Sequence, residues 1–229
     1  MKRERSRMRK APPLRRMADA SKKKNFRALF DREYAGKCCG YYTVGNFMTL
    51  DPKELSEVTA MQLKNVINAE ATEYQVKVWE KCFAALIKQF RKHPKYSNLY
   101  LIVEYSVPTK QLFAKKRTER KVCKRPDIIL LERNTVFVLE FKETSKNTRN
   151  FSRYLKQTQG YCSRFNLHHK YARKMEVVGC LVFDRSRNYR EIIEGIHCIS
   201  PDKLPEILKE ACPEPKKYFR INEWMDGFE

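Results

Sequence analysis

Residues 125–142 read RPDIILLERNTVFVLEFK, and this stretch decides the fold. It holds two apolar runs, residues 127–131 and residues 136–142, on either side of a short turn at residues 132–134. Apolar runs of this length, rich in β-branched and aromatic residues and separated by a turn, are typical of paired strands. After Asp127 the first run has no polar residue, which indicates a strand buried on both faces.

Three chargeable side chains lie at the ends of these two strands. Side chains alternate along a strand, so Glu140 and Lys142 point to one face while Leu139 and Phe141 point into the core. Pairing of the strands brings Asp127 beside Glu140 and Lys142. Two carboxylates and an ammonium group at one sheet edge provide oxygen ligands for a hard cation and a positive group near a scissile phosphate. The pattern therefore predicts a divalent-metal phosphodiesterase.

A solvated charge pair is the alternative explanation for Glu140 and Lys142, because most exposed ion pairs have no special role. The residues before the first strand favour the functional explanation. Pro126 restricts Arg125 to an extended conformation and fixes the approach to the strand. A carboxylate such as Asp127 at the mouth of a buried strand is costly unless another group pairs with it.

The arrangement resembles the PD-(D/E)XK nuclease superfamily, whose signature here is Pro126-Asp127 followed by Glu140-Phe141-Lys142. Residues 157–161, Gln-Thr-Gln-Gly-Tyr, resemble the Gln-x-x-x-Tyr element that RecB-like members carry on the helix after the catalytic strand. Upstream segments are similar to nuclease modules that precede helicase domains in some bacterial proteins. The likeness spans residues 41–185.

The resemblance implies a restriction-endonuclease-like α/β fold with a central mixed sheet of four to five strands flanked by helices. It also implies Mg²⁺, with Mn²⁺ as a substitute, bound by Asp127, Glu140 and the carbonyl of Phe141. The superfamily commonly adds a glutamate from the first long helix. Glu73 is the choice here, with Glu70 and Glu80 as alternatives on the same segment.

Further roles follow from the same resemblance. Lys142 would orient the attacking water or stabilise charge on the phosphate. Gln157 and Tyr161 would flank the metal site. Arg153, Gln157, Tyr161 and Arg164 recur at helical spacing, so they share one face of the expected helix. An ordinary amphipathic surface is the alternative for that face.

The chain of 229 residues has 48 basic and 27 acidic side chains and a formal charge of +21. Clustered Lys and Arg gain affinity for polyanions by releasing counterions, so we expect nucleic acid as the partner, and DNA before RNA. No apolar run approaches the roughly 20 residues that span a bilayer, and no signal-peptide core follows the basic N-terminus. We therefore expect an intracellular protein without a membrane partner, nuclear in a eukaryote or virus and cytoplasmic in a bacterium.

Basic residues gather in an expected disordered arm at residues 1–24 and in a loop that arrives at Asp127. A mobile solvated loop is the alternative to a phosphate-binding one. The residues expected to contact nucleic acid are Lys115, Lys116, Arg117, Arg120, Lys121, Lys124, Arg125, Arg153 and Arg164.

The expected organisation is the arm, a nuclease-like domain over residues 25–212 and an aromatic tail over residues 213–229. Within the domain, the patterns predict helices over 52–67, 70–92, 151–167 and 201–211, and further strands over 99–107, 175–183 and 192–199. Asp51 and Pro52 form the expected start of the first helix.

Eight cysteines are scattered without a Cys-x-x-Cys pair, which indicates reduced and mostly buried thiols. A zinc site from Cys38, Cys39 and the pair His168-His169 is the alternative, although neither spacing matches a structural zinc motif. The sequence contains no phosphate-binding loop, because Gly36-Lys37 lacks the preceding glycine of that motif. Any helicase activity would therefore belong to another chain.

The sequence thus predicts a metal-dependent nuclease, with endonuclease and exonuclease activity left open. One alternative is a catalytically inactive nucleic-acid-binding module. Another is an interaction subunit of a helicase, replication, repair or defence complex, with the aromatic tail as the contact.

Overall fold

The computed structural model describes residues 37–67, 70–108, 123–143, 149–218 and 220–228. The expected basic arm and most of the basic loop before Asp127 lie outside these residues. The described part belongs to one compact unit, Glu33–Glu229, so the expected boundary at residue 213 falls inside that unit.

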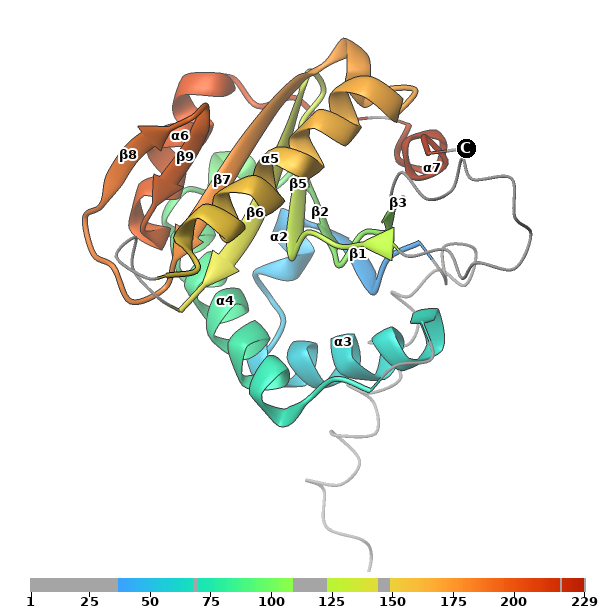
Figure 1. Cartoon of the computed structure of the whole chain (residues 1–229), viewed down its shortest axis with the longest axis vertical. Coiled ribbons are helices and arrows are strands. Elements are labelled where there is room, and N and C mark those ends of the chain that lie inside the picture. Colours follow the sequence, from blue (N-terminus) through green and yellow to red (C-terminus); the bar gives the residue numbers. More distant parts are fainter. Residues whose placement is uncertain (1–36, 68–69, 109–122, 144–148, 219, 229) are drawn as a thin grey trace, which may run out of the picture. The chain divides into compact units, whose positions relative to one another are not determined.

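A mixed sheet of seven strands forms the centre of this unit, in the order β1-β2-β5-β6-β7-β9-β8 (Figure 1). Strands β1, β2, β5 and β6 pair antiparallel in that order, and β6, β7 and β9 pair parallel. Strand β8 pairs antiparallel with β9 at the edge of the sheet. The α/β class is confirmed. The strands of the sheet are β1 (Gly40–Thr43), β2 (Tyr100–Val103), β5 (Ile128–Leu131), β6 (Thr135–Lys142), β7 (Glu176–Phe183), β8 (Arg190–Ile193) and β9 (Ile196–Ile199).

The expected sheet of four to five strands was too small, for two reasons. Strand β1 is short, and a run of four residues gives little period-two signal to read. The segment expected as one strand over residues 192–199 is a hairpin, in which Glu194 and Gly195 take positive φ angles of 49° and 76° and reverse the chain. Two positive φ angles in succession are the signature of a tight hairpin turn.

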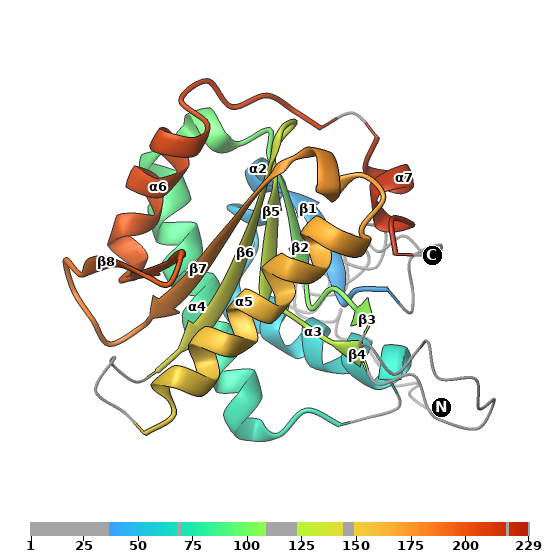
Figure 2. The same cartoon turned by 45° about the horizontal axis from the view of Figure 1, so that its top comes forward.

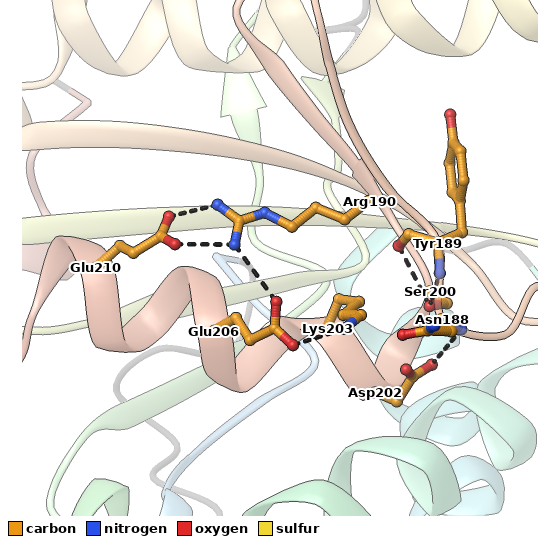
Figure 3. A network of polar contacts seen from close by, with 8 residues as sticks. All are labelled: Asn188, Tyr189, Arg190, Ser200, Asp202, Lys203, Glu206 and Glu210. Atoms are coloured by element: carbon orange, nitrogen blue, oxygen red, sulfur yellow. Dashed lines mark hydrogen bonds and ion pairs between the residues drawn. The ribbon is translucent and has the colours of Figure 1, made fainter.

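Polar contacts fix this edge hairpin to the following helix (Figure 3). Arg190 of β8 bonds Glu210 through both terminal nitrogens, at 2.8 and 2.5 Å, and also reaches Glu206 at 3.4 Å. Both glutamates lie on α6 (Leu204–Ala211), which follows the short 3₁₀ turn η5 (Pro201–Lys203). The bidentate geometry holds the outermost strand against the helix, so the sheet edge is anchored although its side chains are largely exposed.

The long helices occupy both faces of the sheet (Figure 2). Helix α5 (Phe151–His168) lies across β6 and β7 on one face, and α4 (Glu73–Lys92) and α6 lie on the other. Helix α3 (Pro52–Ile67) packs against α4, and Asp51 Oδ1 accepts from the amides of Lys53 and Glu54, both at 3.0 Å. The predicted helices over 52–67 and 151–167 and the Asp51 cap are confirmed, and α4 begins three residues later than the 70–92 pattern indicated.

The alternation along β6 decides which side chains meet which helix. Val136 and Val138 belong to the apolar cluster under α5 together with Ile129 of β5 and Phe165 of α5. Glu140 and Lys142 have the same parity as these valines, so they lie on the α5 face. Asp127 has the parity of Ile129, and β5 pairs with β6 in the register Ile128 to Leu139, so Asp127 comes opposite Glu140 on that face.

Strand β2 is shorter than the expected strand over residues 99–107. It ends at Val103, and Glu104 takes a φ of 52°, which is unusual for a residue with a side chain. The chain then continues into the two-residue strand β3 (Val107–Pro108), which pairs with β4 (Cys123–Lys124) outside the main sheet.

The C-terminal segment packs into the domain. Helix α7 (Ile221–Met225) buries Trp224 completely, and its indole lies against His169 with ring centroids 4.4 Å apart. Tyr105 donates from its hydroxyl to the carbonyl of Met225 at 2.9 Å. This segment is therefore part of the core. Among the described residues, no helix is both long enough and apolar enough to span a membrane.

Gly179 sets the close approach of α5 to the sheet. A Cβ atom built on Gly179 would lie 2.7 Å from Cys162 Sγ and 3.4 Å from Thr158 Cγ2, both on α5, and 2.6 Å from Ile196 Cδ1. Only a residue without a side chain fits at this distance. Because Thr158 is the neighbour of Gln157, the spacing also determines how far Gln157 reaches over the sheet.

We predict that Gly179→Ala lowers the free energy of unfolding by about 1–3 kcal/mol, because the added methyl overpacks the interface between α5 and β7. Gly160→Ala is the matched control, since Gly160 lies within α5 with nothing within 4 Å of its built Cβ. There alanine should be neutral or stabilise by up to about 1 kcal/mol. Urea unfolding measures both variants, and equal stabilities would contradict the packing argument.

Candidate active site

The ends of three neighbouring strands bring acidic residues together. Glu104 follows β2, Asp127 precedes β5, and Glu140 lies near the end of β6. Asp127 Oδ2 accepts a hydrogen bond from the backbone amide of Phe141 at 2.7 Å. This bond fixes the Asp127 carboxylate at the end of β6, as the sequence predicted for the paired strands.

Glu140 is buried, with 2% of its surface exposed. Its Oε1 accepts from Lys142 Nζ at 2.6 Å and from Gln157 Nε2 at 2.8 Å. Its Oε2 is buried and has no hydrogen-bond partner among the described residues. An unpaired buried carboxylate oxygen is expensive, which makes it a candidate position for a ligand.

A chain of hydrogen bonds connects α5 to the sheet at this point. Gln157 Nε2 also contacts the Tyr161 hydroxyl at 2.9 Å, and that hydroxyl donates to the carbonyl of Arg125 at 2.8 Å. Gln157 and Tyr161 therefore link Glu140 to the segment that leads into Asp127. The sequence placed these two side chains beside the carboxylates, and the structure brings them there.

Glu104 is the site residue that the sequence reasoning missed. Its side chain is 6% exposed, and its Oε1 accepts from Trp79 Nε1 of α4 at 3.1 Å. Its amide donates to the carbonyl of Asp127 at 3.1 Å, so the left-handed backbone at Glu104 joins two strand ends. The signal was available, because Glu104 ends the apolar run of residues 99–103 as Glu140 ends the run of β6.

Glu73, the glutamate expected to complete the site, lies elsewhere. It is the first residue of α4, and its side chain is exposed and not part of the cleft described below. Glu70 lines that cleft but pairs with Lys64 at 2.7 Å, and Glu80 does not line it. The structure therefore brings Glu104, and not a glutamate from the first long helix, to Asp127 and Glu140.

Burial raises the pKa of all three carboxyl groups, and neighbouring carboxylates add to this effect at Glu140 and Glu104. Burial and then the charge of Asp127 raise the pKa of Glu140 to about 8 from its ordinary 4.5. Burial also raises the pKa of Asp127, and burial followed by the charges of Asp127 and Glu140 raises the pKa of Glu104 well above its usual range. For Lys142, burial acts to lower the pKa, but Glu140 and Asp127 outweigh it and raise the pKa.

Glu104, Asp127 and Lys142 line the floor of a cleft of about 1290 Å³ between α5 and the corner of α3 and α4, and Glu140 is buried beside them. Three of the residues expected to contact nucleic acid line it, namely Lys124, Arg125 and Arg153. Arg164 lies outside the cleft and donates to the carbonyl of Pro108. The remaining five, Lys115, Lys116, Arg117, Arg120 and Lys121, lie outside the described residues.

Within the described parts of the chain, no group of three or more His, Cys, Asp or Glu side chains is already arranged as a metal site. The zinc alternative at Cys38, Cys39 and His168-His169 therefore has no support, and the seven cysteines with described side chains are buried thiols outside any disulfide. At the acidic group, Lys142 holds one oxygen of Glu140 while the other oxygen is orphaned. Repelling carboxylates with a free buried oxygen suit a cation that would bind after Lys142 shifts.

Comparison with protein-family models gave no match to this chain, and comparison with curated proteins gave none either.

We predict that the chelator-treated protein loses stability as the pH rises from about 5 to about 8. The pKa of Glu140 is about 8 in the folded protein and ordinarily 4.5, so in this window the unfolded chain has lost a proton that the folded protein retains. Stability then falls as the pH rises. Urea unfolding at pH 5 and pH 8 measures the difference. Glu140→Gln removes the titrating group and should show a smaller fall; an equal fall would assign the pH dependence to other groups.

Proposed function

We propose that this chain is a metal-dependent nuclease of PD-(D/E)XK type with a restriction-endonuclease-like fold, which hydrolyses phosphodiester bonds of nucleic acid, DNA in the first place. The observation that carries the proposal is the meeting of Asp127, Glu140 and Lys142 at adjacent ends of the central strands β5 and β6, where Asp127 and Lys142 line the cleft and Glu140 is buried beside them. Gln157, on the helix after the catalytic strand, supports it by donating to the Glu140 carboxylate, and Tyr161 supports it by accepting from Gln157.

The residues suit Mg²⁺, or Mn²⁺ in its place. Asp127 and Glu140 supply carboxylate oxygens, and the carbonyl of Phe141 is a further candidate ligand on the same strand end. A bound divalent ion supplies charge stabilisation and a water of lowered pKa. The raised pKa values of the carboxylates favour a cation, because it would relieve the repulsion between them.

The ammonium group of Lys142 contacts two side chains at the site. Its ammonium group pairs with Glu140 at 2.6 Å and lies 5.0 Å from the centre of the Tyr154 ring. If a cation were bound by Glu140, the ammonium group of Lys142, which lines the cleft, would be free to turn toward it. There it would orient the attacking water or stabilise the negative charge that develops on the phosphate.

Glu104 takes the place that the superfamily pattern reserved for a helical glutamate. Trp79 holds one of its oxygens, and the strained backbone at Glu104 aims the side chain at the acidic group. A residue held in a rarely populated conformation at a cleft is a frequent property of functional sites. We assign Glu104 as a positioning residue for Asp127, to whose carbonyl its amide donates.

The pairing of Lys142 with Glu140 favours one competing function. A module that uses its own lysine to neutralise the acidic group could bind nucleic acid without cutting it. The interaction-subunit alternative is weaker, because it relied on the aromatic tail and Trp224 is 0% exposed within this chain.

We predict that Asp127→Ala, Glu140→Ala and Lys142→Ala each reduce Mg²⁺-dependent cleavage by about a hundredfold or more, since each removes charge stabilisation at the reacting phosphate. Cleavage of linear, circular and single-stranded DNA, with Mg²⁺ and with chelator, is the measurement. Glu176→Gln, at an exposed position at the start of β7, is the control and should cleave like the parent. A Glu140→Ala protein that cuts at the parental rate, or a parent that binds without cutting, would refute the assignment.

We further predict that Glu104→Gln and Glu73→Gln behave differently. Glu104→Gln keeps the backbone bond to Asp127 and an oxygen for Trp79 and removes only the carboxylate charge, which would help to hold the cation, so cleavage should fall about tenfold or more. Glu73→Gln should have no effect, because that side chain is exposed outside the cleft. Rates at saturating and at limiting Mg²⁺ separate weakened metal binding from misfolding. The reverse ranking of the two variants would restore the glutamate of the first long helix to the site.

A further inference from the structure

The two walls of the cleft differ in chemistry. On the α5 side, Arg149 precedes the helix, and Arg153 and Lys156 follow at intervals of four and three residues. All three line the cleft with exposed side chains. Arg153 and Lys156 lie one turn apart on α5 and Arg149 lies just before its first turn, so the three cations form a row that can follow a phosphate backbone.

The opposite wall comes from the corner of α3 and α4. It presents Glu70, Thr72, Tyr74 and Gln75 and, deeper in the cleft, Trp79. Among the described residues that line the cleft, this wall contributes no Lys or Arg. It therefore offers an aromatic ring, an amide and a hydroxyl, which suit nucleobases better than phosphates.

Tyr74 is the prominent group on that wall, with 65% of its surface exposed. Its hydroxyl donates to Glu143 Oε2 at 2.7 Å, and the other oxygen of Glu143 accepts from Lys81 Nζ at 2.7 Å. Glu143 directly follows Lys142. These contacts hold an exposed ring at the rim of the cleft next to the catalytic strand, so the ring loses little freedom when a ligand stacks on it.

We propose that the cleft takes a single strand of nucleic acid, with its phosphates along Arg149, Arg153 and Lys156 and its bases toward the first turns of α4, where one base stacks on Tyr74. This inference rests on the proposed function and names its substrate class. A single strand has its phosphates on one side and its bases on the other, which matches the cationic wall and the aromatic wall of the cleft.

A duplex fits this asymmetry poorly. Either groove of a duplex is bordered by phosphates on both sides, so a duplex that entered the cleft would bring one backbone against the α4 wall. That wall contributes no Lys or Arg to the lining of the cleft, and the ammonium groups beside it, Lys64 and Lys81, are already paired with Glu70 and Glu143. The bases of a duplex would also be stacked within the helix and unavailable to Tyr74.

The test measures binding in the presence of chelator, so that it does not depend on cleavage. Fluorescently labelled 12-nucleotide strands, as DNA and as RNA, are compared with the corresponding DNA duplex. We expect at least one of the single strands to bind about tenfold or more tightly than the duplex. Tyr74→Ala should weaken single-strand binding about fivefold or more and leave duplex binding unchanged, since stacking on one base accounts for a loss of this size.

Two matched variants separate stacking from other effects. Tyr74→Phe keeps the ring and loses the bond to Glu143, so it should retain most of the affinity. Leu167→Ala removes an equally exposed apolar side chain of α5 that lies outside the cleft, and it should bind like the parent. Arg153→Ala should lower the slope of log affinity against log salt by about 0.7, whereas Arg187→Ala, exposed outside the cleft, should not.

Equal or tighter binding of the duplex, or full single-strand affinity in Tyr74→Ala, would overturn the inference. If the parent nevertheless cuts duplex with Mg²⁺, the proposed function survives that result. If the parent binds neither form and cuts neither, both proposals fall.

Discussion

The antiparallel register of β5 and β6 is the constraint on which the rest of the structure depends. Pairing of Ile128 with Leu139 sets Asp127 opposite Glu140 and directs both carboxylates to the face that α5 covers. A slip by one residue would turn every side chain of one strand to the other face and separate the two acids. The apolar residues that specify the core therefore also specify the site, and the amide of Phe141 on Asp127 locks the same register from the polar side.

The approach of α5 connects packing with chemistry. Glycine at position 179 lets the helix lie close to β7, and from that distance Gln157 reaches Glu140 while Tyr161 reaches the carbonyl of Arg125. Buried carboxylates are costly unless hydrogen-bond partners satisfy them. Here the partners are the backbone amide of Phe141, the ammonium group of Lys142 and the side-chain amide of Gln157. They satisfy the group incompletely, because Glu140 Oε2 is left without a described partner. Incomplete satisfaction at a cleft floor is a common property of sites that await a ligand.

The sequence was sufficient wherever one local pattern determined the outcome. It located the hairpin around residues 132–134, the helix that carries Gln157, and the meeting of Asp127, Glu140 and Lys142, because alternation and helical spacing are local properties. It failed where long-range contacts decide. The hairpin turn at Glu194 and Gly195 interrupts an apolar run that reads as one strand. Glu73 was predicted instead of Glu104. The apolar run before Glu104 marks it as a candidate, but the position of the Glu104 side chain depends on a left-handed backbone and on Trp79, 25 residues away.

The charges of the cleft pose a physical problem to which a cation is the simplest solution. Three acidic side chains with raised pKa values lie at or directly beneath its floor, and in their ionised forms they would repel phosphate as well as one another. Its α5 wall carries a row of cations that attracts phosphate toward that floor. A polyanion held by the wall would approach the acidic group only against repulsion unless a divalent ion stood between them. Under the proposed function Asp127 and Glu140 would hold that ion, whose charge would offset theirs, and Lys142 and the cations of the wall would then act on the same phosphate. Metal and substrate binding should then be mutually dependent, because each reduces the electrostatic cost of the other.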